Sequence, residues 1–371
     1  MSAAHLPIWK KILFSSIIIA LILAVPLALI GGYLGYRKLT LSYEYCGSYA
    51  QIDDRLGWRL AANQTSCVGL QNRLKGEVYF SSKVYTNSAQ LRSTATKGEP
   101  IPNAIATIGD SWVFGYGVDF EEAWPHKLSK QLDHPVNNLG VPSYSSAQTY
   151  LLLERDLAHL NPGVVIHYNN RMWKRSICVG NTPPTEITEP CFWADTNSQK
   201  VTLTTPPGTY VSDQAAKNIL PGGIGTSGHD PWHYYLVVRP LEILRTTLGT
   251  RDTKETLLWN ESHGPISNDV QSSILDEELK LYSQLMKKHG FTLVWVDPYG
   301  FYRESIERLP QLNEASFVYM GQNSWNELVE KPAADLGPHE KYIPHDGHFT
   351  AKMNTFVADG IAEFLRAEGL F

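Results

Sequence analysis

A serine in a short turn is the first group of this 371-residue chain that could carry out covalent chemistry. Ser111 closes the motif Gly109-Asp110-Ser111, which directly follows the apolar run 104–108. Such a run, bounded by proline and glycine, predicts a strand buried on both faces of a parallel sheet. A serine at the carboxyl end of that strand is exposed, and its backbone N–H can point at a developing oxyanion. Ser111 is therefore a candidate nucleophile, and helix capping is the alternative role.

A serine nucleophile needs a histidine that takes its proton and an acid that fixes the tautomer of the histidine. The sequence offers His348 and Asp346, on a loop before a C-terminal amphipathic segment. Asp297 also follows a predicted strand and ranks second as the acid. His345 with Asp346 and His348 leaves a metal cluster open, but no further ligand with recognisable spacing follows. We favour a Ser111, His348 and Asp346 triad that needs no metal ion and no organic cofactor.

Four blocks in chain order give the sequence a resemblance to the SGNH/GDSL hydrolases. They are the serine turn with residues 115–118 behind it, the segments 138–144 and 164–171, and the loop 346–348. In the last block one residue separates the acid from the histidine, where the commoner family spacing has two. That shorter spacing resembles membrane-anchored and polysaccharide-modifying branches of the family.

The resemblance also implies the donors of an oxyanion hole. These are the N–H groups of Ser111 and Gly140 and the side-chain amide of an asparagine. The third block contains Asn169-Asn170 in place of the family's usual Gly-x-Asn-Asp. We prefer Asn170, with Asn169 as the alternative.

A further likeness lies upstream of the serine. Residues 54–58, 86–88 and 91–92 look like the prelude that bacterial membrane-anchored members carry, so the resemblance covers residues 52–179 and 278–371. Short alternating segments separated by Asn, Ser and Gly predict a small β-rich region over residues 41–100.

The elements that must position these residues alternate regularly between strand and helix. Apolar patterning predicts strands at 104–108, 136–139, 164–168 and 291–296, and helices at 121–132, 147–160 and 274–289. This order favours an α/β fold in which a parallel sheet carries helices on both faces. The expected architecture is a three-layer, SGNH/flavodoxin-like catalytic domain over residues 101–371.

An irregular insertion at about 171–265 interrupts this pattern. Proline and glycine pairs predict loops there, with one helical segment at 234–248. An insertion of this length is typical of a lid or a binding loop, and its aromatic content argues against disorder. The aromatic residues either pack the insertion onto the core or contact a sugar or acyl chain; they include Trp173, Phe192, Trp193, Trp232, Tyr234 and Tyr235.

Residues 12–36 carry no charge and are long enough to cross a bilayer as a helix. We expect an uncleaved anchor within residues 1–40, because no clear cleavage site for a signal peptide follows. Two positive charges flank the segment on each side, so the charge rule does not indicate its orientation.

Four cysteines bear on orientation. They form two local pairs, Cys46 with Cys67 and Cys178 with Cys191, as expected for two disulfides outside the cytoplasm. Four unpaired, buried thiols are the alternative. With disulfides, the catalytic domain faces the periplasm or the cell exterior.

A formal charge of −5 provides no basic surface for nucleic acid. The residues above predict a serine-dependent ester hydrolase, similar to an acetyl esterase, whose partner is an ester-bearing glycan or lipid. An O-acyltransferase that acetylates an extracytoplasmic glycan is the first alternative. A non-catalytic, membrane-anchored binding protein on a degraded fold is the second. The oligomeric state is left open.

Overall fold

The computed structural model describes most of the chain in long stretches. The described residues are 26, 29, 31–33, 40–95, 99–180, 189–195, 198, 200–205, 259–260, 264–265, 268–312 and 316–371. By its packing the chain divides into two compact units. One consists of residues 1–42, 71–77 and 227–256, and the other holds the remainder, including the serine turn and the C-terminal loop.

The first unit contains the predicted membrane anchor. Apart from isolated positions between 26 and 33, residues 12–36 lie outside the described residues. In the part of the chain that the structure describes, no helix has the length and apolar character needed to span a bilayer. Residues 72–76 of this unit form a turn. A hydrogen bond of 2.8 Å from the N–H of Gly76 to the carbonyl of Asn72 closes it.

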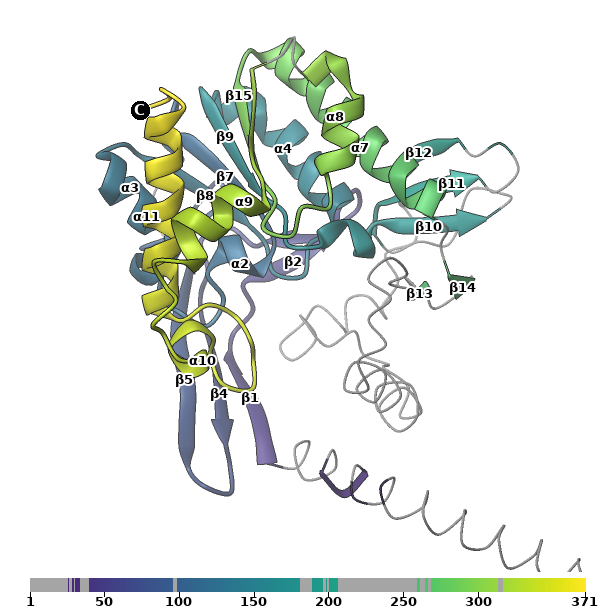
Figure 1. The fold of residues 1–371 in the computed structure, drawn as a ribbon. Helices are drawn as coiled ribbons and strands as arrows, with labels where there is room; N and C mark the ends of the chain where they lie inside the picture. Colours follow the sequence, from purple (N-terminus) through teal and green to yellow (C-terminus); the bar gives the residue numbers. More distant parts are fainter. Residues whose placement is uncertain are drawn as a thin grey trace, which may run out of the picture. The chain divides into compact units, whose positions relative to one another are not determined.

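A nine-stranded sheet forms the framework of the fold (Figure 1). In spatial order its strands are β1 (Leu41–Cys46), β4 (Thr65–Asn72), β5 (Glu77–Thr86), β6 (Arg92–Ser93), β8 (Val136–Gly140), β7 (Ile105–Gly109), β9 (Val164–Tyr168), β15 (Thr292–Val296) and β16 (Phe317–Met320). The parallel strands that pattern predicted are present, within one residue at each end for β7, β8, β9 and β15.

The five strands from β8 to β16 are parallel. Numbered along the chain, their order is 2-1-3-4-5, the flavodoxin-like order expected from the sequence. Strand β6, by contrast, pairs antiparallel with both β5 and β8. The predicted parallel sheet is therefore present as the part from β8 to β16 of a larger, mixed sheet. Strands β1, β4, β5 and β6 of the β-rich region join the same sheet, because β6 pairs with β8.

Helices cover both faces of the parallel strands (Figure 1). The long helices are α3 (Trp124–Leu132) and α11 (Ala351–Ala367) on one face, and α4 (Ser146–Leu160) and α7 (Asn268–His289) on the other. The short helical segments are α2 (Ser111–Phe114), η1 (Phe120–Glu122), η2 (Met172–Arg175), α8 (Arg303–Arg308), η4 (Pro310–Leu312), α9 (Gln322–Trp325), the π-helical η5 (Asn326–Glu330) and α10 (Pro338–Lys341). Smaller sheets contain β2 (Ala50–Asp53) with β3 (Gly57–Leu60), β10 (Ile177–Gly180) with β11 (Cys191–Asp195) and β12 (Val201–Thr204), and β13 (Trp259–Asn260) with β14 (Gly264–Pro265).

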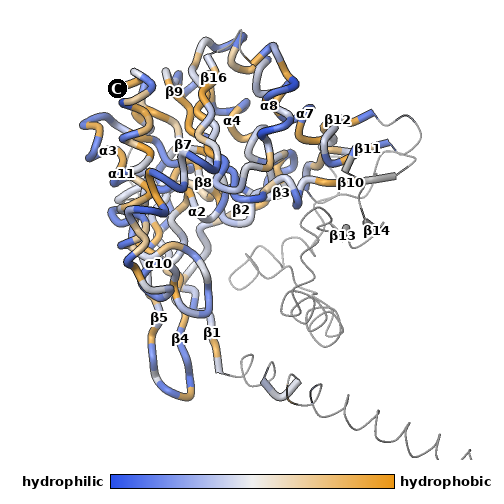
Figure 2. Tube along the Cα trace, viewed as in Figure 1, coloured by the Kyte–Doolittle hydropathy of each residue, from blue (hydrophilic) through white to orange (hydrophobic). Residues whose placement is uncertain are grey.

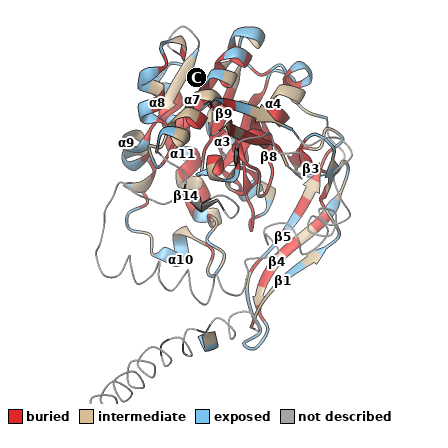
Figure 3. Ribbon diagram, turned by 90° about the vertical axis from the view of Figure 1, so that its right-hand side faces the viewer, coloured by how far each residue is buried: buried red, intermediate tan, exposed pale blue. Residues whose placement is uncertain are grey.

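Strand β9 shows why two helical layers are needed. Successive side chains point to opposite faces of a strand, and here both sets are buried. Ile166 and Tyr168 join the core cluster that contains Trp124 of α3. His167 points the other way, with its ring 5.1 Å from the ring of Tyr282 in α7. The parallel strands are accordingly mostly apolar in Figure 2 and buried in Figure 3.

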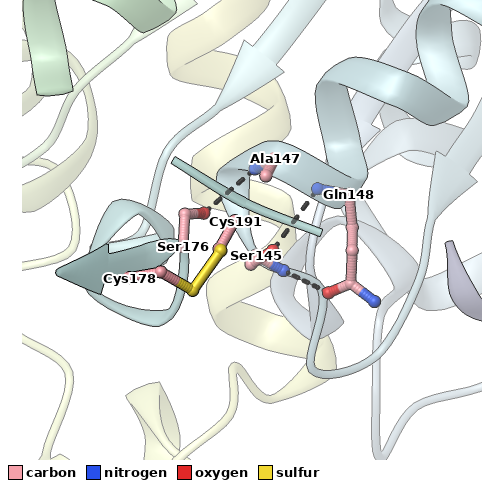
Figure 4. Close-up of a disulfide and its surroundings, with 6 residues drawn as sticks. All are labelled: Ser145, Ala147, Gln148, Ser176, Cys178 and Cys191. Atoms are coloured by element: carbon pink, nitrogen blue, oxygen red, sulfur yellow. Dashed lines mark hydrogen bonds between the residues drawn. A yellow bond between two sulfur atoms is a disulfide. The ribbon is translucent and has the colours of Figure 1, made fainter. Parts of the chain in front are cut away.

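Both predicted disulfides form. Cys46 of β1 is joined to Cys67 of β4, and Cys178 of β10 is joined to Cys191 of β11. Figure 4 shows the second disulfide beside the start of α4, where the N–H of Ala147 donates to the Ser176 hydroxyl at 2.9 Å. Disulfides persist in oxidising compartments, so the two bonds indicate an extracytoplasmic location.

The described part of the insertion packs onto the core. Trp173 and Phe192 are fully buried, and Trp193 is half-buried. For Trp173 and Phe192 the structure therefore shows packing onto the core, which was one of the two roles considered. The expected helix at 234–248, with Trp232, Tyr234 and Tyr235, lies outside the described residues.

A buried polar chain crosses the layer between β9 and α7. The Asn169 amide donates to the Tyr302 hydroxyl at 3.0 Å, and that hydroxyl donates to the Glu278 carboxylate at 2.7 Å. Glu278 has no solvent exposure. Burial raises the pKa of the Glu278 carboxyl to about 8, although the Tyr302 hydrogen bond opposes the shift.

This raised pKa predicts a pH-dependent stability. Between the ordinary pKa of 4.5 and the folded pKa of about 8, the folded protein binds a proton that the unfolded chain has released. The free energy of unfolding must therefore fall as the pH rises through that window. A Glu278→Gln variant cannot make this contribution. Its melting temperature relative to the wild type should rise from pH 5 to pH 8.

Thermal unfolding followed by circular dichroism at four pH values would measure the effect. Glu277→Gln, at the half-buried neighbouring position, is the matched control. A difference between Glu278→Gln and the wild type that stays constant from pH 5 to pH 8 would contradict the raised pKa.

Candidate active site

The candidate residues gather at the switch point of the sheet, where the strand order reverses between β7 and β9. Ligands bind at this place in doubly wound sheets, outside the carboxyl ends of the strands. Ser111 follows β7, and Asn169 and Asn170 follow β9. Ile108 pairs with His167 in the parallel register.

A chain of hydrogen bonds links the three residues that the sequence singled out. His348 Nε2 lies 2.7 Å from Ser111 Oγ, and His348 Nδ1 lies 2.5 Å from Asp346 Oδ1. With the Nδ1–H donating to the carboxylate, Nε2 is free to accept the serine proton. The rings of Tyr116 and Trp112 lie 4.9 and 5.5 Å from the imidazole and restrict its rotation. The geometry is that of a nucleophile, a general base and an orienting acid.

Several hydrogen bonds hold the Asp346 carboxylate in place. Asp346 Oδ1 also accepts a hydrogen bond of 3.3 Å from the His348 N–H, and Oδ2 accepts one of 3.0 Å from the Tyr43 hydroxyl. Burial by itself raises the pKa of the Asp346 carboxyl, but the hydrogen bond and charge of His348, with the Tyr43 bond, lower the pKa below its ordinary value. The carboxylate therefore stays ionised at neutral pH.

Two alternative roles do not fit the structure: Asp297 as the acid of the triad, and His345 as part of a metal site. Asp297 accepts hydrogen bonds from the Tyr302 N–H at 2.9 Å and the Tyr319 hydroxyl at 3.1 Å, and serves the turn after β15. The ring of His345 packs 4.7 Å from the ring of Tyr79. Among the described residues, no three His, Cys, Asp or Glu side chains are placed to share a metal ion.

The expected oxyanion donors fall into two groups. The Ser111 N–H has no acceptor among the described residues, and Asn170 is half-buried at the end of β9. The Gly140 N–H instead donates to Asn138 Oδ1 at 2.9 Å. The Asn169 amide belongs to the buried chain through Tyr302. Of the expected donors, the Ser111 N–H and the Asn170 side chain are thus the two that no described residue engages.

Asp110, next to the serine, stabilises the serine turn through two hydrogen bonds to its buried carboxylate. One carboxylate oxygen caps α2 by accepting from the Trp112 N–H at 3.1 Å, and the other accepts from the Arg175 guanidinium at 3.0 Å. Burial raises the pKa of the Asp110 carboxyl, and the positive charge of Arg175 partly offsets that shift. Sequence reasoning missed Arg175 because it comes from η2, after the third block.

A second missed residue is Arg92, from the prelude. Its guanidinium is fully buried and donates to the carbonyl groups of Phe114, Gly115 and Val118. Burial lowers the pKa of Arg92 to about 10, so the side chain remains charged at neutral pH. The family resemblance included Arg92 in a motif, and its partners show the physical role. It closes the loop that leads away from the serine.

No family model matches the sequence, and no curated protein matches it. Among solved structures the chain is similar to a protein described as lipolytic and of the G-D-S-L family from Desulfitobacterium hafniense DCB-2, at 12% identity and a TM-score of 0.34. That match covers 70% of this chain and 98% of the other.

Two acetyl xylan esterases are also similar. AlAXEase shares 12% identity over 70% of this chain and 98% of its own, with a TM-score of 0.35. Est2A, from the rumen bacterium Butyrivibrio proteoclasticus, shares 11% identity over 74% of this chain and 66% of its own, with a TM-score of 0.36.

The packing of Gly140 generates a prediction about the site. A Cβ atom at this position would lie 2.2 Å from the Phe114 nitrogen, in the backbone of α2. We expect Gly140→Ala to lower the free energy of unfolding by about 1–3 kcal/mol, as overpacking does, and to displace the helix that begins at Ser111. Chemical denaturation and reactivity of Ser111 toward a fluorophosphonate probe would measure the two effects.

Gly163→Ala is the matched control, because a Cβ atom there meets nothing within 4 Å. It should change the stability by no more than about 0.5 kcal/mol. Equal stability and equal labelling of the two variants would show that β8 and α2 are not in the close contact described.

Proposed function

We propose that this protein is a serine esterase of the SGNH/GDSL type that acts on carbohydrate or lipid esters outside the cytoplasm. The observation that carries the proposal is the unbroken hydrogen-bond chain from Ser111 through His348 to Asp346 at the switch point of the sheet. The resemblance of the four sequence blocks and the oxidising compartment indicated by the disulfides support it.

The reaction proceeds through an acyl-enzyme. Ser111 Oγ bonds to the ester carbonyl carbon while its proton passes to His348 Nε2, and Asp346 stabilises the imidazolium. The Ser111 N–H and the Asn170 amide stabilise the oxyanion. Gly140 becomes a further donor once its N–H turns away from Asn138. Collapse of the intermediate breaks the bond to the alcohol oxygen, which leaves with the proton from His348.

Water then attacks the acyl-enzyme, with His348 again taking the proton, and the acid product leaves Ser111. Transfer of the acyl group to a sugar hydroxyl is the second candidate function. It uses the same intermediate and differs only in the acceptor. The observation that favours it is an aromatic pocket beside the serine, described in the next subsection. The third reading, a binding protein on a degraded fold, would not require this hydrogen-bond chain.

We further propose that residues 12–36 anchor the chain in a membrane as a single span, with the catalytic domain on the outer side. The uncharged length of this segment and the two disulfides support that placement.

Turnover of p-nitrophenyl acetate by the full chain tests the proposed chemistry. Ser111→Ala should lower kcat by at least about 10³-fold and abolish the acetyl adduct seen by intact-mass spectrometry, because no other oxygen replaces the nucleophile. Asp346→Asn should lower kcat by about 10³–10⁴-fold, because the amide favours the wrong tautomer of His348.

Asp297→Asn is the control for the acid, because Asp297 is the rival carboxylate at the end of a neighbouring strand. It should retain kcat within about tenfold of the wild type. Equal release by the wild type and Ser111→Ala, without an adduct on either, would favour the binding-protein reading.

A further inference from the structure

A pocket of about 220 Å³ lies beside the triad and plays no part in the mechanism above. Its walls include Trp112, Tyr168, Tyr299, Trp325, Tyr342 and Phe349. Ligand pockets for drug-sized molecules enclose roughly 300–1,000 Å³, so this pocket suits a smaller unit. The rings of Trp112, Tyr299 and Tyr342 are partly accessible, whereas those of Tyr168, Trp325 and Phe349 are 5% exposed or less. The accessible rings provide flat apolar faces of the kind on which a ring-shaped ligand stacks.

Two of these residues join the pocket to the triad. Trp112 directly follows Ser111, and Phe349 directly follows His348. The ring of Trp112 lies 4.2 Å from the ring of Phe349 and 5.5 Å from the imidazole of His348. The pocket and the triad therefore lie on either side of the Trp112 ring.

One wall of the pocket is polar. Gln322, Asn326 and Glu330 line it and recur every four residues along α9 and η5, so they lie on one side of this helical segment. Gln322 and Asn326 are exposed, and their side-chain amides have no hydrogen-bond partner among the described residues. The segment from Asn326 to Glu330 is a π-helix, a feature that often occurs at functional sites.

The charges around the pocket exclude a cationic ligand. Glu330 could attract a quaternary ammonium group into the aromatic pocket, but its carboxylate already pairs with Lys341 Nζ at 3.3 Å. The Arg171 guanidinium lies 4.2 Å from the centroid of the Tyr299 ring. Two cations thus occupy the carboxylate and one aromatic face that such a ligand would need.

The polar wall also argues against an acyl chain. A hydrocarbon in the pocket would cover the amides of Gln322 and Asn326 without offering them hydrogen bonds, and each buried unpaired amide is unfavourable. A pyranose ring is complementary to both the aromatic wall and the polar wall. Its C–H faces stack on aromatic rings, and its hydroxyl groups donate to and accept from amides and a carboxylate.

We propose that this pocket binds one pyranose ring of a glycan, next to the sugar unit whose ester or hydroxyl oxygen reaches Ser111. The inference rests on the proposed function and names its substrate class. The glycan is the esterified substrate of a hydrolase or the acceptor of an acyltransferase, because both place the sugar oxygen at the same serine.

Binding of defined tetrasaccharides to the full chain tests the subsite. Isothermal titration calorimetry with xylo-, cello-, chito- and hexuronate tetrasaccharides should detect binding of at least one of the four. Asn326→Ala and Gln322→Ala should each raise its dissociation constant about tenfold, because each removes one hydrogen bond from a ligand hydroxyl. Tetramethylammonium and octanoate should not compete.

Asn323→Ala is the matched control, since Asn323 is an exposed residue of the same helix that does not line the pocket. Its affinity for the bound tetrasaccharide should equal that of the wild type. The subsite is refuted by no binding of any tetrasaccharide, by an equal loss of affinity in Asn323→Ala, or by displacement of the sugar by tetramethylammonium or octanoate.

Turnover of p-nitrophenyl acetate by the wild type separates this inference from the proposed function. Turnover without tetrasaccharide binding refutes the subsite alone. Tetrasaccharide binding that depends on Asn326, without turnover or an acyl adduct, refutes the esterase and leaves a sugar-binding pocket.

Discussion

The hydrogen bond between Ser111 and His348 joins residues 237 positions apart, and the rest of the structure serves to hold its two ends together. The serine end depends on β7 and on the loop that Arg92 closes. The histidine end depends on α11, which begins at the cap Thr350, two residues after His348. A buried hydrogen bond of 3.0 Å from the Trp124 N–H to Asn354 Oδ1 secures α11 against α3. Packing of α3 and α11 on the same face of the sheet thus sets the distance across the triad.

Polar groups buried beneath the site hold its backbone. Asp110 ties the turn to α2 and to Arg175, and Arg92 satisfies three carbonyl groups that have no strand or helix partner. Buried charges are costly unless they are paired or hydrogen-bonded; Asp110 is paired with Arg175, and Arg92 is hydrogen-bonded. Neither residue touches the reacting atoms. Their shared effect is to make the loop around the serine rigid, so that the nucleophile meets the imidazole without further rearrangement.

In the enzyme that we propose, the site and the pocket have different roles. Ser111, His348 and Asp346 can act on any ester carbonyl of suitable size, so the triad itself confers little selectivity. Selectivity has to come from surfaces that contact the alcohol. Under our proposal the pocket provides such a surface, and its lining includes the residues that follow Ser111 and His348 in the chain. Since the same walls would bind a substrate or an acceptor, hydrolysis and transfer differ in how well water reaches the acyl-enzyme.

Local pattern in the sequence determined the buried strands, the long helices and the two cysteine pairs, because period and spacing are properties of neighbouring residues. The sequence blocks also supplied the candidates for the triad. Only the tertiary structure decided the rest. It joined the β-rich region to the central sheet, engaged Asp297 with Tyr302 and Tyr319, and tied the Gly140 N–H to Asn138. It also placed Asn169 in the core and assembled the pocket from five separate segments. Each of these outcomes depends on contacts between residues far apart in the chain, which no local pattern specifies.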